Sequence, residues 1–273
     1  MSNLALRFLT ALVAIPLLIA SISWHQPYGV WLWVLFAQVA GLREWMNMTM
    51  PTAPRLQRGF GVVVGVALGT LVCWVPDTRM LLAGVWGSTI AIFLFFLFFY
   101  PPIETVASRI SSTVGGVLYA GLLISPLMMF KLRPSGDGAA WIYICLSSAW
   151  LSDTGAYFAG RFLGPFIPAK LWPAISPKKT MIGGVGGMAG SLLALSVAKL
   201  WYLPMLSWLD VVAIAAPANL LGQLGDLCES LIKRSVGVKD SGVLLPGHGG
   251  MLDRIDALLL VVPYVYLYAQ LRF

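Results

Sequence analysis

Long apolar runs, separated by short polar segments, make up most of this 273-residue chain. A helix needs roughly 20 apolar residues to cross a hydrocarbon core about 30 Å thick. The pattern predicts nine such helices, at residues 6–23, 30–42, 60–76, 80–99, 113–130, 139–158, 182–202, 209–226 and 257–271. The second run is short and leads into Arg43 and Glu44. We therefore expect an all-α, polytopic integral membrane protein with no separate soluble domain and no internal repeat.

Composition supports a membrane protein, because 59% of the residues are hydrophobic and only 11% are charged. A soluble domain carries about 25% charged residues. The three cysteines show no paired spacing, which argues against a disulfide or zinc framework. The first run has a basic flank at Arg7, as a signal peptide does, but no small-residue cleavage site follows. We expect it to be a retained helix.

The positive charges lie unequally on the two sides of the predicted membrane. Thirteen Lys and Arg residues fall on the side of the N-terminus and four on the other. The positive-inside rule then places the N-terminus and the long loops 159–181 and 227–256 in the cytoplasm, with the C-terminus outside. The formal charge of +7 suggests anionic lipid headgroups or phosphorylated substrates as partners. Nucleic acid is not expected, since no single basic domain gathers the charges.

A polar stripe runs along the eighth predicted helix and past its end. Its members recur at steps of four, three, four and three, and so share one helical face: Asn219, Gln223, Asp226, Ser230 and Lys233. An Asp at the bilayer centre costs about 2.5–3.5 kcal/mol, so such residues are functional candidates. The alternative is a structural polar seam between helices.

The next predicted helix opens with Asp253 and Asp256, neighbours on its first turn. The helix dipole alone favours carboxylates there. A second interpretation is that the hairpin from Asp226 brings Asp226 and Asp253 side by side as oxygen ligands for Mg²⁺. Residues 246–250, "PGHGG", precede these acids, and their glycines permit close approach to a ligand. His248 is either an ordinary loop histidine or a site residue.

Two upstream segments face the same side of the membrane. "SDTGAYFAGRFLG" places Asp153, Tyr157 and Arg161 on one helical face. "SPKKT", residues 176–180, offers two lysines and two hydroxyls in a predicted loop, which suits phosphate, although its lysines also fit the positive-inside rule. The following "GGVGGMAG" favours a closely packed helix face over a phosphate loop. Metal-binding acids beside phosphate-binding cations indicate phosphoryl or nucleotidyl transfer.

The stretch "ESLIKRSVGVKDSGVLLPGHGGMLDRID" closely resembles the signature of the phosphatidate cytidylyltransferases, or CDP-diacylglycerol synthases. The matching positions are Ser230, Lys233, Arg234, Lys239, Asp240, Pro246, His248, Gly249, Gly250, Asp253, Arg254 and Asp256. "SDTGAYFAGRFLG" and "SPKKT" resemble two further family segments. The resemblance is strong over residues 150–257, while the N-terminal half is similar only as a run of membrane helices. It divides the chain into N-terminal helices, 1–135, and a C-terminal catalytic region, 136–273, of one membrane domain.

The resemblance implies that CTP and phosphatidic acid give CDP-diacylglycerol and pyrophosphate, with Mg²⁺ required. It implies a two-cation site, Mg²⁺ with K⁺ as the candidate second ion, on Asp226 and Asp253 with Asp256 in support. Lys233 and His248 join the two acids as expected catalytic residues. The expected substrate-binding residues are Asp153, Tyr157, Arg161, Ser176, Lys178, Lys179, Thr180, Glu229, Ser230, Arg234, Lys239, Asp240, Gly249, Gly250 and Arg254. A bacterial inner membrane location and a homodimer are also expected.

One position departs from the family pattern. After "SPKKT" the family has a polar Glu or Gln where this chain has Ile182. A related CTP-dependent transferase acting on another lipid phosphate or alcohol is therefore an alternative. A transporter is an alternative of a different class, but its acids would lie nearer the bilayer midplane. A purely structural scaffold has no need of "GHGGMLDRID".

Overall fold

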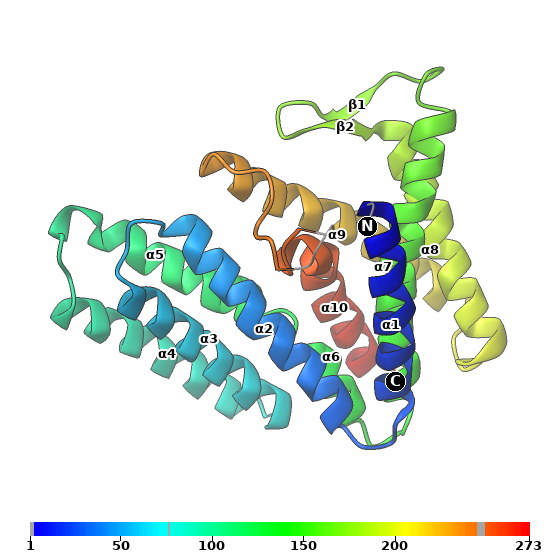
Figure 1. Cartoon of the computed structure of the whole chain (residues 1–273). Coiled ribbons are helices and arrows are strands. Elements are labelled where there is room, and N and C mark those ends of the chain that lie inside the picture. The colour runs from blue at the N-terminus through cyan, green and yellow to red at the C-terminus, as the bar shows by residue number, and fades with distance from the viewer. Residues whose placement is uncertain (1–2, 76, 245–248) are drawn as a thin grey trace. The chain divides into compact units, whose positions relative to one another are not determined.

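The computed structural model describes residues 3–75, 77–244 and 249–273, and nearly all of its regular structure is helical (Figure 1). The helices are α1 (Asn3–Ser23), α2 (Tyr28–Thr49), α3 (Arg55–Trp74), α4 (Thr78–Phe98), the 3₁₀ turn η1 (Ile103–Thr105), α5 (Val106–Gly116), the π-helix η2 (Val117–Leu122), α6 (Pro126–Lys131), α7 (Gly138–Phe162), α8 (Met181–Trp201), α9 (Trp208–Ser235) and α10 (Leu252–Arg272). Two compact units are formed: Met1–Lys131 with Val236–Ile255, and Leu132–Ser235 with Asp256–Phe273.

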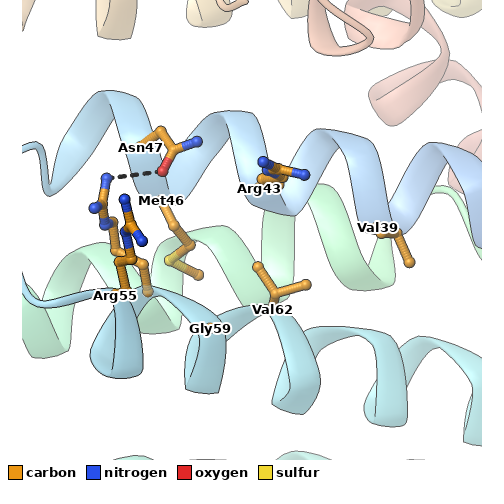
Figure 2. Close-up of a pocket in the computed structure, with 8 residues that line it drawn as sticks. Val39, Arg43, Met46, Asn47, Arg55, Gly59 and Val62 are labelled. Atoms are coloured by element: carbon orange, nitrogen blue, oxygen red, sulfur yellow. Dashed lines mark hydrogen bonds between the residues drawn. The ribbon is translucent and has the colours of Figure 1, made fainter. Parts of the chain in front are cut away.

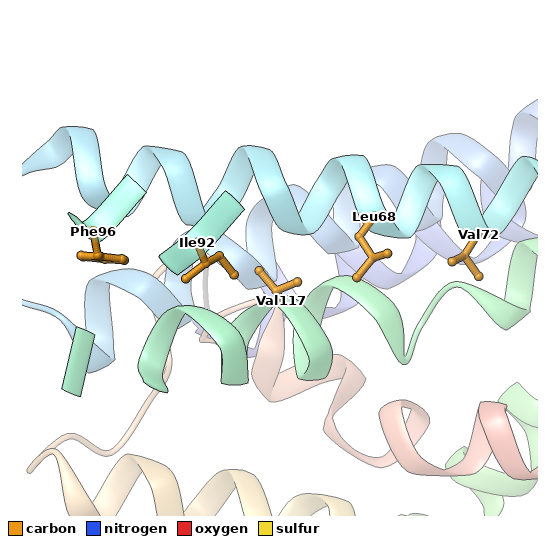
Figure 3. Packing of buried hydrophobic residues seen from close by; sticks show 5 residues of the cluster. All are labelled: Leu68, Val72, Ile92, Phe96 and Val117. Carbon is orange, nitrogen blue, oxygen red and sulfur yellow. The ribbon is translucent and has the colours of Figure 1, made fainter. Parts of the chain in front are cut away.

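In the first unit, α3, α4 and η2 pack around a small apolar cluster. Its members are Leu68, Val72, Ile92, Phe96 and Val117, all buried (Figure 3). A Cβ built on Gly121 of η2 would lie 2.9 Å from the Gly65 carbonyl oxygen of α3. Glycine at these positions therefore lets the two helices approach closely.

The predicted span 113–130 falls within the apolar helical segment Ile103–Lys131, but it is not one continuous α-helix, because the chain forms α5, η2 and α6 in succession. Pro126 has no N–H to donate and disfavours a helical residue before it, which interrupts the α-helix. The Gly121 carbonyl instead accepts hydrogen bonds from the Gln38 side chain at 2.8 Å and the Ser125 hydroxyl at 3.3 Å. Polar side chains thus replace the interrupted backbone pairing.

In the second unit, α7 and α8 lie side by side along facing glycines (Figure 1). A Cβ on Gly190 would collide with the Leu151 carbonyl oxygen, and one on Gly186 would collide with Ala159. The prediction that "GGVGGMAG" forms a closely packed helix face is confirmed. This packing fixes how α7 presents its polar residues beside the start of α8.

The prediction that "SPKKT" is a loop is wrong. Residues Ser176–Thr180 form strand β2, which pairs antiparallel with β1, Lys170–Trp172. Pairing with β1 gives the polar segment the backbone hydrogen bonds that a loop would leave to water. Thr180 then ends the strand and caps α8, since its Oγ1 accepts the Gly183 N–H at 3.1 Å.

Five helical segments in the described part of the chain are long and apolar enough to cross a membrane: Arg55–Trp74, Thr78–Phe98, Ile103–Lys131, Met181–Trp201 and Trp208–Ser235. They support an integral membrane protein, and the count of nine spans stays a prediction. Two helices extend beyond their predicted apolar runs, α2 to Thr49 and α9 to Ser235. In both cases the polar residues after the apolar run continue the helix.

Candidate functional site

A cleft of about 450 Å³ in the second unit collects residues from four elements. Its lining comprises Asp153, Ala156, Tyr157, Gly160 and Arg161 of α7, Lys178, Lys179 and Thr180 of β2, Gly183 and Gly184 of α8, and Gln223 and Asp226 of α9. Residues of the two upstream segments and of the α9 polar stripe thus line one cleft in this unit. Ser176 lies on β2 but is not part of this lining.

An ion pair joins the strand to α9 across the cleft. Lys179 Nζ lies 2.7 Å from Asp226 Oδ2 and also donates to the Gln223 carbonyl at 3.3 Å. Asp226 Oδ1 accepts the Ser230 hydroxyl at 3.1 Å. Both charged side chains remain partly exposed, at 23% for Lys179 and 39% for Asp226. Because both side chains are partly exposed, both are accessible to a ligand. Their pairing contributes little to stability.

The polar stripe of α9 has two kinds of members. Asn219 Oδ1 accepts the Ser152 hydroxyl of α7 and the Gln223 amide, both at 2.8 Å. Gln223 also donates to the Gly184 carbonyl of α8 at 3.3 Å. Asn219 therefore belongs to a seam between helices, whereas Asp226, about two turns further along, lines the cleft. The structural interpretation of the stripe applies to Asn219, and the functional role of Asp226 stays a prediction.

The other cleft residues present donors to the open side. Arg161 Nη1 donates to the Tyr157 hydroxyl at 3.0 Å, and both side chains are exposed. Lys178 is exposed as well, while Thr180 is buried at the start of α8. The cleft thus holds an exposed guanidinium and ammonium near the Lys179–Asp226 pair.

Asp256, just before the predicted run 257–271, has a carboxyl group whose pKa is raised above its ordinary value. Burial, together with the negative charges of Asp226 and Asp153, raises the pKa of Asp256 to about 7, against the lowering effect of a hydrogen bond from the Ala257 N–H. A cation near Asp226 and Asp256 would relieve this repulsion. No group of three His, Cys, Asp or Glu side chains able to hold a metal occurs among the described residues. The two carboxylates suit Mg²⁺, which usually keeps several waters and binds substrate phosphates.

Glu229 and Lys233 form a second ion pair on α9. Lys233 Nζ lies 3.2 Å from Glu229 Oε2, and both side chains are buried. Neither residue lines the cleft as described, and their catalytic and substrate-binding roles stay predictions. Arg234, the next residue, is exposed.

In the first unit, Asp253 organises the loop that precedes α10. Its Oδ2 accepts the backbone N–H groups of Ser241 at 3.0 Å and Gly250 at 2.8 Å, together with the Ser241 hydroxyl at 3.0 Å. Gly249 has a φ of +82°, which favours glycine. A Cβ on Gly250 would collide with the Ser241 hydroxyl. Gly249 and Gly250 are therefore required by the loop itself.

The remaining signature residues that the structure describes do not line the cleft. Lys239, Asp240 and Arg254 are exposed in the first unit. Pro246 and His248 lie outside the described residues. Asp253 belongs to the first unit and Asp226 to the second, so their pairing stays a prediction.

Sequence reasoning missed Glu44, which the structure ties to the same loop. This buried carboxylate on α2 accepts the N–H groups of Met251 and Leu252, each at 2.9 Å, and the Ser241 hydroxyl at 3.2 Å. It satisfies orphan donors at the N-terminus of α10, where the helix dipole favours a negative charge. The available signal was an acid among apolar neighbours, Trp45 and Met46, at the end of an apolar run.

A family model described as the cytidylyltransferase family matches residues 5–272. The chain is 33% identical over 267 residues to a protein of Staphylococcus haemolyticus named phosphatidate cytidylyltransferase, covering 94% of this chain and 95% of that protein. Proteins of the same name from Staphylococcus epidermidis and Staphylococcus aureus are 44% identical over 136 and 137 residues. These two matches span about half of each protein, 50% of this chain and 51% of the relative.

Proposed function

We propose that this chain, which belongs to the cytidylyltransferase family, transfers the cytidylyl group of CTP to phosphatidic acid and releases pyrophosphate. One observation carries the proposal beyond family membership. Arg161, Lys178, Lys179 and Asp226 come from three separate segments and line one cleft. Cations for a triphosphate thus lie beside a carboxylate suited to a metal.

In the proposed reaction a phosphate oxygen of phosphatidic acid attacks the α-phosphorus of CTP. The new P–O bond forms as the bond from the α-phosphorus to the α,β-bridging oxygen breaks, and pyrophosphate takes the leaving electron pair. A phosphate monoester is largely doubly ionised near neutral pH, so the nucleophile needs no strong base. This chemistry calls mainly for positioning and charge neutralisation.

The residues of the cleft would supply both. Lys178 and Arg161 are exposed and free to contact the β- and γ-phosphates, whose charge grows as pyrophosphate leaves. Lys179 would move its ammonium from Asp226 to a phosphate oxygen when CTP enters. That exchange leaves the Asp226 carboxylate available and places a cation where charge develops.

Mg²⁺ is the proposed cofactor, with K⁺ as a second cation, and Asp226, Asp256 and Asp253 are the residues that would hold them. A bound Mg²⁺ would neutralise phosphate charge and orient the triphosphate. The mutual repulsion of Asp226 and Asp256 supports a cation at this place. Lys233, His248 and the remaining signature residues are proposed to complete the substrate site.

We further propose a bacterial inner membrane location, with the N-terminus and the motif segments on the cytoplasmic face. The distribution of Lys and Arg supports this orientation, which would bring a water-soluble nucleotide to a lipid held in the bilayer. A homodimer is the proposed assembly, from family resemblance alone.

Pyrophosphate release tests the reaction class. Purified full-length protein in neutral detergent would receive CTP, Mg²⁺ and phosphatidic acid, with each omitted in turn. Release that requires all three supports the proposal, and no release from folded protein contradicts it. Ile182 lies between the lining residues Thr180 and Gly183, so an isoprenoid phosphate and an isoprenoid alcohol should replace phosphatidic acid in parallel. Pyrophosphate release only with the isoprenoid phosphate, or CDP release with the isoprenoid alcohol by phosphoryl transfer, would favour a related transferase.

A further inference from the structure

A second pocket lies in the first unit, between the C-terminal part of α2 and the beginning of α3. Its volume is about 680 Å³, and its lining residues are Val39, Arg43, Met46, Asn47, Arg55, Arg58, Gly59 and Val62. In Figure 2, Asn47 and Val39 lie on α2 and Arg55 and Val62 on α3, and the dashed line at Asn47 marks its hydrogen bond with Arg58. This pocket shares no lining residue with the cleft of the second unit.

Three arginines give this pocket its charge. In the part of the chain that the structure describes, Arg43, Arg55 and Arg58 form no ion pair with a carboxylate. Glu44 follows Arg43, but its carboxylate is committed to the N–H groups of Met251 and Leu252. The pocket therefore carries three positive charges that no described acid neutralises.

Arg58 supplies an independent sign of a missing anionic partner. Its Nη1 donates to Asn47 Oδ1 at 2.9 Å, which holds the guanidinium against α2. Its Nε is buried and has no hydrogen-bond partner among the described residues. A buried donor left unpaired costs about 1–3 kcal/mol, so such groups are rarely left without a ligand or water.

The shape of the pocket points to a lipid as the source of the anion. Val39, Met46 and Val62 add apolar walls next to the arginines. The volume lies in the range of sites for whole small molecules and far exceeds what one phosphate group needs. Basic pockets between membrane helices bind phospholipid headgroups, because arginine matches phosphate oxygens while apolar walls receive the rest of the lipid.

We propose that Arg43, Arg55 and Arg58 form a headgroup site for an anionic phospholipid, with the phosphate on the three guanidinium groups and the glycerol and upper acyl chains along Val39, Met46 and Val62. The inference goes beyond the transfer reaction and does not require it. A bound lipid would lie against α2, which carries Glu44, so occupancy would steady the helix that anchors the loop before α10.

The test measures lipid binding without CTP. Full-length protein in neutral detergent is titrated with dioctanoyl phosphatidylglycerol, a phosphodiester that is not an acceptor in the proposed reaction, and the thermal shift is recorded. Parallel titrations use dioctanoyl phosphatidylcholine, glycerol 3-phosphate and inorganic phosphate. The test variant is Arg43→Gln/Arg55→Gln, which changes two exposed side chains and keeps the Arg58–Asn47 bond. The control variant is Arg79→Gln/Lys170→Gln, which removes equal charge from exposed positions outside the pocket.

Phosphatidylglycerol should bind the unmodified protein and the control alike, and the test variant about 25-fold more weakly, since each basic residue near an anionic lipid contributes roughly a factor of five. Equal affinity in the test variant overturns the site. An equal loss in the control variant overturns it too, because net charge alone would explain the binding. A full shift with inorganic phosphate or glycerol 3-phosphate overturns the lipid assignment. Because these titrations measure lipid binding and not catalysis, their outcomes stay the same even if the protein does not transfer a cytidylyl group.

Discussion

The ammonium of Lys179 lies 2.7 Å from the carboxylate of Asp226, joining the strand before α8 to the middle of α9. The pair places a potential phosphate ligand and a potential metal ligand at one point of the cleft. We interpret it as the resting arrangement, in which each charge neutralises the other until CTP and a cation provide separate partners.

Replacing Lys179 with Met should raise the KM for CTP and lower kcat together, by about 10²-fold in kcat/KM. The expected loss reflects one ammonium removed from phosphate charge that grows during transfer. Lys178→Met is the comparison variant, and a smaller loss is expected from it, since Lys178 is proposed to contact the outer phosphates but makes no ion pair with Asp226. Steady-state kinetics with CTP as the varied substrate measures both. A larger loss in Lys178→Met than in Lys179→Met would contradict the role of the pair.

The Asp226→Asn variant should remain folded and lose about 10²–10³-fold in kcat, because an amide is a poor Mg²⁺ ligand. The thermal midpoint should change little, since the lost ion pair is partly exposed. Asp77→Asn is the control: Asp77 caps α4, and Asn caps helices equally well. Turnover is measured at several Mg²⁺ concentrations. Wild-type turnover with an unchanged Mg²⁺ dependence would rule out Asp226 as a metal ligand.

Glu44→Gln should destabilise the protein by about 1–3 kcal/mol and reduce activity, because an amide has one acceptor oxygen for three donors. Its NH₂ would also face the backbone N–H groups at the start of α10. Glu104→Gln changes an exposed acid in the same unit and should have no effect. Denaturant unfolding and limited proteolysis within residues 236–252 report the change. If stability and cleavage match those of Glu104→Gln, Glu44 does not hold the loop.

Gly190→Ala should impair folding or lower the thermal midpoint, since its Cβ would collide with the Leu151 carbonyl of α7. The helices would have to separate, which would also disturb the cleft that both line. Gly87→Ala is the control, because nothing lies within 4 Å of a Cβ at that position. Thermal unfolding in detergent compares the two. A Gly190→Ala protein as stable as Gly87→Ala would show that α7 and α8 do not need this approach.

The apolar runs predicted where most helices lie, because crossing lipid requires continuous helical hydrogen bonding. They did not predict where helices end, since polar residues at the ends of α2 and α9 continue the helix without changing the apolar pattern. The strand at Ser176–Thr180 was missed because it depends on a short partner, Lys170–Trp172, with little pattern of its own.

The candidate site was predictable in part, because regular spacing along a helix shows which residues share one face. Spacing along a helix placed Asp153, Tyr157 and Arg161 on one face, and they do line one cleft with Asp226. Glu44 could not be assigned this way, because its partner Leu252 is 208 residues away along the chain and only the tertiary fold brings them together.

The most direct test of the proposed transfer follows the label of CTP. The protein is incubated with phosphatidic acid, Mg²⁺ and CTP labelled with ³²P at either the α- or the γ-phosphate, and the lipid is extracted into organic solvent. We predict label in the lipid from α-labelled CTP alone, with the γ-label recovered in pyrophosphate. Lipid labelled from γ-labelled CTP would indicate phosphoryl transfer, and together with an absence of α-label it would contradict the proposed reaction.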